Sequence, residues 1–288
     1  MVISSNNIPD SKGINSYYRD KSLAKLLEYY CGRELFEQVE NKFIELGEIV
    51  GSELEELALS ADKNPPKLKK RSRVGTLSND IEKHPDFIKI EKLVFEKFGL
   101  AAMSHRHDVF GLQQKLPPII KYGLTFLFVQ SEFGICCPLS MTDSLTRTLK
   151  KFGDEKLVEK FFDQLTSQDL DYLFQGAMFM TEQHAGSDVG SIDTFAEFED
   201  GNWFLTGDKW FCSNPDADLA MVLARHNKKI SGTKGLALFL LPKKLENGDP
   251  NNYEITRLKD KLGGRSFASG EIKLNRAFAY LVGNLDEG

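Results

Sequence analysis

The sequence predicts an α+β fold: an α-helical N-terminal domain (residues 1–170) followed by a small antiparallel β-barrel or sandwich domain (residues 171–288). Two observations lead to this prediction. Up to about residue 170, apolar side chains recur three and four positions apart, as on one face of a helix. From about Asp171, short apolar runs alternate with turn signals, which is typical of strands. Helices first and strands second imply two compact units.

The N-terminal part begins with a polar tail over residues 1–13 and then becomes helical after Tyr17. One long amphipathic helix is predicted, with a bend at Gly51-Ser52, because glycine and serine weaken a helix interior. Its apolar face comprises Phe36, Val39, Phe43, Leu46, Val50, Leu54 and Leu57, with Glu and Lys between them.

The next segment, Asp62 to Arg73, interrupts the helices. Pro65-Pro66 excludes a helix there, and six of its twelve residues are basic. A solvated connector is the simpler interpretation, and a phosphate-contacting loop is the alternative.

Four further helices are expected before the pattern changes. Pro85 and Pro117-Pro118 suit first helical turns, and Asp154 suits a helix N-terminus after Gly153. The predicted ranges are Asp86 to Met103, Pro117 to about Gly134, Thr142 to Phe152 and Asp154 to Leu165.

The second part contains strand and turn signals in regular order. Asp200-Gly201 and Asn247-Gly248 predict tight turns, and Pro242 ends an apolar run. The expected strands are Ala196 to Glu199, Trp203 to Leu205, Leu219 to Leu223, Leu236 to Leu241, Tyr253 to Leu258 and Glu271 to Leu274.

Composition narrows the class of protein. The 288 residues are 41% hydrophobic with a net charge of -5, which argues against a protein that coats nucleic acid. Four cysteines form no C-x-x-C pair, so a reduced, cytoplasmic protein is expected. No leader pattern and no membrane-length apolar run are present, so neither export nor a membrane span is expected.

Two motifs suggest a binding site. Met178 to Val189, MFMTEQHAGSDV, places hydroxyls and a carboxylate around Gly186, where a ligand can approach bare backbone. Gly207 to Asn214, GDKWFCSN, places the flat rings of Trp210 and Phe211 near the hydroxyl of Ser213. Together they suit a flat cofactor with polar edges.

This pair of motifs resembles the acyl-CoA dehydrogenase flavoproteins, whose middle domain carries TEPGAGSD and G-x-K-x-[WF]-x-[ST]-N. The resemblance extends to Arg257–Ile272 (RLKDKLGGRSFASGEI) and Cys137–Thr142 (CPLSMT), and covers most of the chain from about Asp80. It is strongest to the AidB-type branch, where Lys209 is likewise followed by Trp-Phe and Pro-Gly is replaced, here by Gln183-His184.

The resemblance implies FAD as cofactor, an acyl-CoA thioester as substrate and α,β-dehydrogenation as reaction. It assigns cofactor contacts to Met178, Met180, Thr181, Ser187, Phe211, Cys212 and Ser213, and substrate contacts to Ser187 and Arg265. The alternative for single residues is structural: Thr181 could cap a turn, and Phe211 could belong to the core.

In the family a C-terminal four-helix domain follows, carrying the catalytic Glu and flavin contacts across a subunit interface. We expect this bundle to be absent here, since the chain ends at Gly288 where the β-domain should finish. The catalytic residue and the electron acceptor therefore stay unassigned, and a homo-oligomer is implied for the complete protein. The alternative function is an AidB-type protective binding factor that reaches nucleic acid only through the missing domain.

Weaker signals favour structural roles. His105 and His107 lie two apart without further ligands, so packing is expected rather than metal binding. Ser231–Gly235 lacks the spacing of a phosphate-binding loop, and His184 is interpreted as a solvent-side substitution. The basic residues Arg257, Lys259 and Arg265 could meet a CoA phosphate or pair with Asp260 and Glu271.

Overall fold

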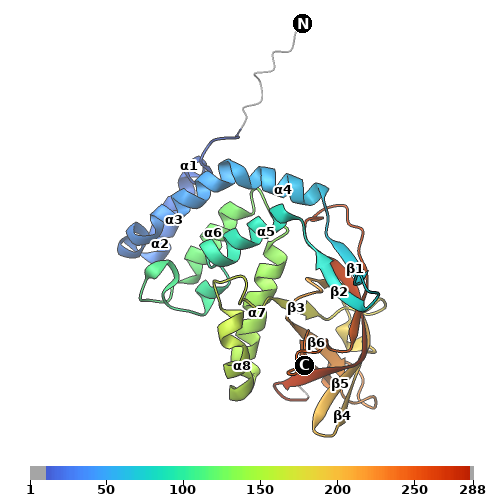
Figure 1. Cartoon of the computed structure of the whole chain (residues 1–288). Helices are drawn as coiled ribbons and strands as arrows, with labels where there is room; N and C mark the ends of the chain where they lie inside the picture. Colours follow the sequence, from blue (N-terminus) through green and yellow to red (C-terminus); the bar gives the residue numbers. More distant parts are fainter. Residues whose placement is uncertain (1–10, 286–288) are drawn as a thin grey trace.

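The computed structural model of the chain describes residues 11–285, and the first ten residues of the predicted tail lie outside this range. Helices occupy the first part and strands the second, as predicted (Figure 1). The α-helices are α1 (Ser16–Arg19), α2 (Lys21–Cys31), α3 (Arg33–Gly51), α4 (Glu53–Lys63), α5 (Pro85–Glu91), α6 (Pro118–Phe128), α7 (Cys136–Phe152) and α8 (Glu155–Leu165).

The long amphipathic helix is confirmed with its bend. Helix α3 ends at Gly51 and α4 begins at Glu53, because Ser52 leaves the helical region with φ −125° and ψ −89°. In Figure 1 the two helices form a bent arch over α5 and α6. The apolar face of the arch is buried in the helical core, where Phe43, Leu46 and Leu54 are fully buried.

Helix boundaries differ from the prediction where packing overrides local pattern. The range 86–103 divides into α5, a π-helix η1 (Lys92–Lys97) and a short 3₁₀ turn η2 (Ala102–Ser104). Helix α6 ends at Phe128 rather than near Gly134, and α7 begins at Cys136, six residues before the predicted start. Helix α8 matches its prediction, and the Asp154 carboxylate accepts from Leu157 N–H at 2.7 Å.

The basic segment after α4 is exposed, as the connector interpretation expects, but it is not irregular. It forms β1 (Lys67–Arg71), which pairs antiparallel with β2 (Leu77–Glu82). The Asn79 amide attaches this hairpin to the neighbouring strand: it donates to Tyr253 O at 2.8 Å and accepts from Ile255 N–H at 2.9 Å.

The C-terminal sheet contains seven strands in the order β3-β6-β4-β5-β9-β7, with β8 paired to β9 and a further β6–β7 pairing. They are β3 (Gly176–Phe179), β4 (Phe195–Glu199), β5 (Asn202–Ser213), β6 (Leu219–Arg225), β7 (Leu236–Pro242), β8 (Tyr253–Leu258) and β9 (Ser269–Val282).

The prediction of a purely antiparallel sheet is wrong, because the sheet is mixed. Strand β3 runs parallel to β6, and β4 also meets β6 in parallel through Phe195 and Arg225. The reason is that β3 enters the sheet directly from the helical part, without a hairpin. Closure into a barrel stays a prediction, since it requires matched strand tilt and shear.

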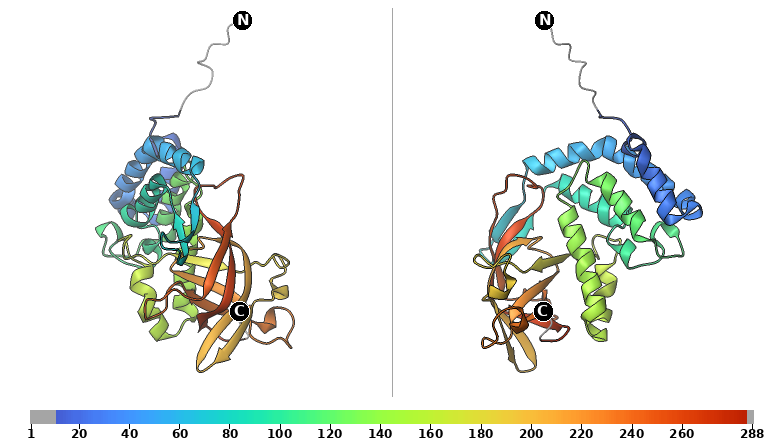
Figure 2. Two further views of the ribbon diagram at one scale, coloured as in Figure 1. Left: turned by 45° about the vertical axis from the view of Figure 1, so that its right-hand side comes forward. Right: turned by 180° about the vertical axis from the view of Figure 1, so that it is seen from behind.

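The helical part and the sheet share a packed boundary. Figures 1 and 2 both show α7 and α8 beside the sheet. Leu145, Leu149 and Phe161 from these helices share a core cluster with Leu219 and Leu240 of the sheet. The proposed domain boundary at residue 170 therefore stays a prediction, although the change from helix to strand falls there.

No helix within residues 11–285 combines the length and the apolar character that crossing a bilayer requires.

We predict that Gly47→Ala destabilises the chain by about 1–3 kcal/mol. Helix α3 passes so close to the N-terminal segment that an added Cβ would lie 2.7 Å from Tyr17 N and would overlap Asn15. Urea unfolding measures the change, with Glu48→Ala as control on an exposed position of the same helix. Equal unfolding midpoints for both variants would contradict this close packing.

Candidate functional site

The two sequence motifs meet in the structure. The first begins within β3, at Met178, and continues into the loop that follows, and the second occupies the end of β5. The backbone N–H of Trp210 donates to Thr181 O at 2.8 Å. The Lys209 ammonium donates to Met180 O at 3.2 Å and to the Glu182 carboxylate at 2.9 Å. The Met180–Glu182 segment is thereby fixed along the second motif.

Glu182 and Lys209 form a buried ion pair, with side-chain exposures of 4% and 0%. Glu182 also accepts the backbone N–H groups of Asp193 at 2.7 Å and Thr194 at 3.0 Å. Burial acts to raise the pKa of Glu182, but Lys209 and these donors outweigh it and leave the pKa below its ordinary value. Glu182 is therefore ionised and ties both ends of its own loop to β5.

The loop after Glu182 is open to solvent. His184 is exposed and contacts Ser191 O at 3.1 Å and Asp193 at 3.3 Å, in agreement with a solvent-side position. Ser187 is exposed as well. A Cβ added to Gly186 would meet nothing within the described chain nearer than Thr181 Cγ2 at 3.8 Å. Internal packing does not require this glycine, so the space beside Thr181 is available to a ligand.

Strand β5 carries a bulge at the aromatic pair. Its register with β9 shifts between Lys209 and Cys212, and Phe211 adopts a left-handed conformation with φ +56°. A bulky residue in this region costs roughly 1–2 kcal/mol. The bulge leaves the Phe211 side chain 63% exposed, which rules out the alternative that it belongs to the core. Exposed apolar surface held at a backbone cost is typical of a binding site.

A basic group packs on the bulge. The Lys259 ammonium lies 3.3 Å from the centroid of the Trp210 ring and 4.5 Å from that of Phe211. Lys259 and Arg257 both pair with Glu271, at 2.7 and 2.6 Å. Arg257 and Lys259 thus form ion pairs with Glu271, which was the alternative to contacting a CoA phosphate.

Ser213 and Asn214 close the second motif. The Ser213 hydroxyl is half-buried and lies 3.3 Å from the Ser269 hydroxyl on β9. The Asn214 amide donates to Gln175 at 3.1 Å and to Gly176 O at 3.2 Å, at the start of β3. Asn214 therefore joins the end of the second motif to the residues just before the first. Glu182 and Lys209 join the two motifs further along.

The other predicted cofactor contacts, Met178, Met180 and Cys212, differ in how far they are exposed to solvent. Met178 is 39% exposed, and Met180 packs partly against the core beside α7 and α8. Cys212 is fully buried in the sheet, where burial raises the pKa of its thiol. Its side chain cannot face a ligand, so any contact must come from its backbone.

Arg265 lies apart from Ser187, in the β8–β9 loop. Its backbone N–H donates to Asp62 of α4 at 2.9 Å. Its side chain lines a shallow pocket of 170 Å³ together with Lys261, Phe267 and Ser269. The link between Ser269 and Ser213 places this pocket beside the second motif.

Of the two histidines in the 105–107 segment, His107 is exposed and His105 takes part in an internal network. His105 contacts Asp143 of α7 at 2.7 Å, and Lys121 of α6 pairs with the same carboxylate at 2.6 Å. The pKa of Asp143 is held well below its ordinary value, because these hydrogen bonds and the lysine charge outweigh the opposing effect of burial. Among residues 11–285, no group of His, Cys, Asp and Glu is arranged to hold a metal ion.

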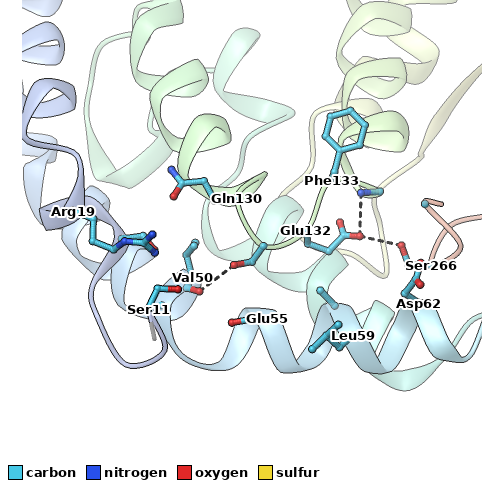
Figure 3. Close-up of a pocket in the computed structure, with 16 residues that line it drawn as sticks. Ser11, Arg19, Val50, Glu55, Leu59, Asp62, Gln130, Glu132, Phe133 and Ser266 are labelled. Atoms are coloured by element: carbon cyan, nitrogen blue, oxygen red, sulfur yellow. Dashed lines mark hydrogen bonds between the residues drawn. The ribbon is translucent and has the colours of Figure 1, made fainter. Parts of the chain in front are cut away.

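A larger pocket of 460 Å³ lies elsewhere, between the α3–α4 arch and the turn before α7. Figure 3 shows Glu132 there, pointing toward Ser266, and the two side chains are hydrogen bonded at 2.9 Å. Glu132 also accepts from Ile135 N–H at 2.7 Å, so it secures the start of α7. None of the predicted cofactor residues lines this pocket.

The residues of the two motifs fit a flat ligand with polar edges. Phe211 and Met178 offer exposed apolar surface, while Thr181 and Ser213 offer half-buried hydroxyls. The open space at Gly186 lies next to Thr181. This combination has the chemistry of a cofactor site with few polar groups at its edge.

Sequence reasoning missed Ser269 and Lys261, although both lie in a segment that carries the resemblance. Their relevance depends on the pairing of Ser213 with Ser269 across β5 and β9. Neither serine belongs to a strand predicted from the sequence, and register is set by contacts distant in the sequence, so no local signal pointed to this pair.

Comparison with known proteins gives two family matches. Residues 6–172 match the model described as adaptive response protein AidB N-terminal domain, and residues 177–277 match acyl-CoA dehydrogenase, middle domain. The first match alone covers more than half of the chain.

Curated relatives agree. The chain is 30% identical to acyl-CoA dehydrogenase family member 11 of Caenorhabditis elegans, covering 95% of this chain and 45% of the relative. It is 32% identical to putative acyl-CoA dehydrogenase AidB of Escherichia coli, covering 81% of this chain and 43% of the relative. The chain thus spans about half the length of these relatives.

Solved structures share the fold. ACDH-11 of Caenorhabditis elegans in complex with C11-CoA superposes with a TM-score of 0.85 at 28% identity, covering 99% of this chain and 49% of that one. A glutaryl-CoA dehydrogenase complex, at 20% identity and a TM-score of 0.65, supports the fold alone; it covers 93% of this chain and 58% of that one. With both domain models matched in order, this chain belongs to the acyl-CoA dehydrogenase family, in its AidB-like branch.

Proposed function

We propose that this chain supplies the flavin-binding wall of an FAD-dependent oxidoreductase that dehydrogenates an acyl-CoA thioester. The observation that carries the proposal is the junction of the two motifs by Glu182, Lys209 and the Trp210–Thr181 hydrogen bond. Near this junction Phe211 and Met178 are exposed, and Thr181 and Ser213 are partly exposed, which supports assigning them to one binding wall.

Each residue has a distinct role in this proposal. Thr181 and the backbone at Met180 face the polar edge of the flavin, and Ser213 donates to it near N5. Phe211 covers the ring with a flat apolar surface. Met178 borders the ring, and Cys212 contributes through its backbone. When bound, FAD would accept the hydride.

Two residues are proposed for the substrate side. We assign Ser187 and Arg265 to the acyl-CoA, because Ser187 is exposed beside the open glycine and Arg265 lines the pocket beyond Ser269. C11-CoA is bound by a similar protein, which makes an acyl thioester the first ligand to test. The base that removes the α-proton is not assigned, and the activity of any longer protein is part of the proposal.

The alternative, a protective binding factor linked to nucleic acid, has less support, since the relatives named here are described as dehydrogenases. We also retain the proposals of two domains meeting near residue 170, a cytoplasmic location and a homo-oligomer. The four cysteines are free, which is compatible with a reducing compartment.

The first test is FAD binding. Titrating the chain with FAD should give a perturbed visible flavin spectrum. Ser213→Ala and Thr181→Val should each weaken binding on the order of tenfold, because a hydrogen bond in a partly buried site is lost. Thr233→Val, at an exposed position, is the matched control.

Wild-type affinity in both site variants would remove the assignment of these hydroxyls, and absence of any binding would contradict the flavin proposal. With FAD bound, anaerobic addition of acyl-CoA thioesters to the longest available form should bleach the flavin. Persistent colour would favour the binding-factor alternative.

Lys209→Met should destabilise the chain by roughly 3–5 kcal/mol, because it leaves the Glu182 carboxylate buried without its partner. Adding Glu182→Gln should recover part of this loss, since it removes the unpaired charge and its amide oxygen still accepts one of the Asp193 and Thr194 N–H groups. Chemical denaturation measures both. Equal losses in the single and double variants would show that the ion pair does not couple the two motifs.

The same pair gives a pH dependence. The pKa of Glu182 lies below its ordinary value of 4.5, so its ionised form stabilises the fold above that pH. This contribution is lost as pH falls through the lowered pKa, and Glu182→Gln should flatten the loss.

Phe211→Gly should change the free energy of unfolding by less than about 1 kcal/mol, because glycine accepts the left-handed backbone and the lost ring is mostly exposed. FAD affinity should nevertheless fall, since the cover of the ring is removed. Phe211→Leu keeps apolar bulk and serves as comparison. Unchanged FAD affinity in Phe211→Gly would exclude the stacking role.

A further inference from the structure

Three side chains form a hydrogen-bonded line behind the proposed flavin wall. Ser213 of β5 and Ser269 of β9 are direct cross-strand partners, and their hydroxyl oxygens lie 3.3 Å apart. The Lys261 ammonium lies 3.3 Å from the Ser269 hydroxyl. Ser269 is buried, at 6% exposure, so its hydroxyl must find partners within this line.

Lys261 is held in place from two further sides. Its ammonium donates to Phe267 O at 2.8 Å and lies 3.3 Å from the centroid of the Phe267 ring. These contacts hold the partly buried ammonium beside the Ser269 hydroxyl, which serves as a further acceptor.

Donor and acceptor chemistry fixes the direction of the line. An ammonium has no lone pair, so Lys261 can only donate to the Ser269 oxygen. The Ser269 oxygen has a second lone pair, so the direction rests on its buried proton, which finds its acceptor in the Ser213 oxygen at 3.3 Å. With Ser269 as donor, the Ser213 proton is left to point away from the strand pair. Because Ser213 belongs to the candidate site, this proton is the one offered to a ligand.

We propose that Lys261 is a positioning residue: acting through Ser269, it makes the Ser213 hydroxyl a hydrogen-bond donor toward the flavin and so favours the oxidised ring, whose N5 accepts a hydrogen bond and carries no hydrogen. The inference rests on the proposed function. Protonated Lys261 strengthens the donor at Ser213, because hydrogen bonds in a chain polarise one another. A neutral amine can accept a proton from Ser269 instead, which releases the Ser213 hydroxyl from its fixed direction.

The surroundings make this control sensitive to pH. Burial lowers the pKa of Lys261 to about 8, against the opposing charges of Cys137 on α7 and Asp62 on α4. From its own segment, Lys259, Asp260 and Arg265 line the same pocket, and Lys259 is neutralised by Glu271. The lysine is therefore charged below about pH 8 and loses its charge above it.

The test compares flavin binding in two redox states. In Lys261→Met, affinity for oxidised FAD should fall roughly tenfold more than affinity for reduced FAD. This shows as a higher flavin midpoint potential. The difference from wild type should be present at about pH 6.5 and absent at about pH 9.5, where the wild-type lysine is neutral too. Ser269→Ala should behave as Lys261→Met, and Lys25→Met, at an exposed position of α2, should match wild type.

A second readout needs no flavin. The ¹³Cε and ¹⁵Nζ resonances of Lys261 in the full chain should titrate well below the ordinary lysine value of about 10.4. Ser269→Ala should lower the pKa further, because the ammonium loses an acceptor. This measurement also shows whether each variant remains folded.

The outcomes separate the two proposals. If FAD binds and Lys261→Met leaves the potential equal to wild type at both pH values, Lys261 has no role toward the flavin and the inference is overturned. An ordinary lysine titration that Ser269→Ala does not move overturns the line itself. If FAD does not bind at all, the proposed function has failed, and the role of Lys261 toward the flavin fails with it.

Discussion

The candidate site depends on one buried ion pair, between Glu182 and Lys209. An ionised carboxylate without water needs several donors, and Glu182 obtains them from Lys209 and from the backbone of Asp193 and Thr194. The pair therefore decides where the segment around Thr181 crosses β5, rather than adding much net stability.

Strand β9 provides the rigid support for this arrangement, since it pairs with β5, β7 and β8. The bulge at Phe211 interrupts the pairing of β5 with β9 only between Lys209 and Cys212, so the rest of the pairing can support it. Lys259, fixed by Glu271, covers the ring of Trp210 on one side of the bulge. The neighbouring Phe211 is left to solvent, so a strained backbone and an exposed ring occur together on β5, the strand that pairs with β9.

Features that depend only on residues near one another in the sequence could be predicted. The bend at Ser52, the start of α8 at Asp154 and the hairpin at Asp200-Gly201 follow from local pattern, and the structure has all three. The parallel entry of β3 beside β6 depends on the whole sheet, and no local signal contains it. For the site, residue types could be assigned from the motifs, but the pairing of Ser213 with Ser269 required the register of β5 and β9.

The helical part of the chain contacts the site at the end marked by Asn214. Glu91 of α5 accepts from Lys83 at 2.8 Å and from the Gln175 amide at 2.9 Å, and Gln175 in turn accepts from Asn214 at 3.1 Å. Asn214 is the next residue after Ser213. A displacement of α5 relative to the sheet would therefore act on the residue beside the proposed donor. The site is built on the sheet, but one of its ends is fixed by the helices.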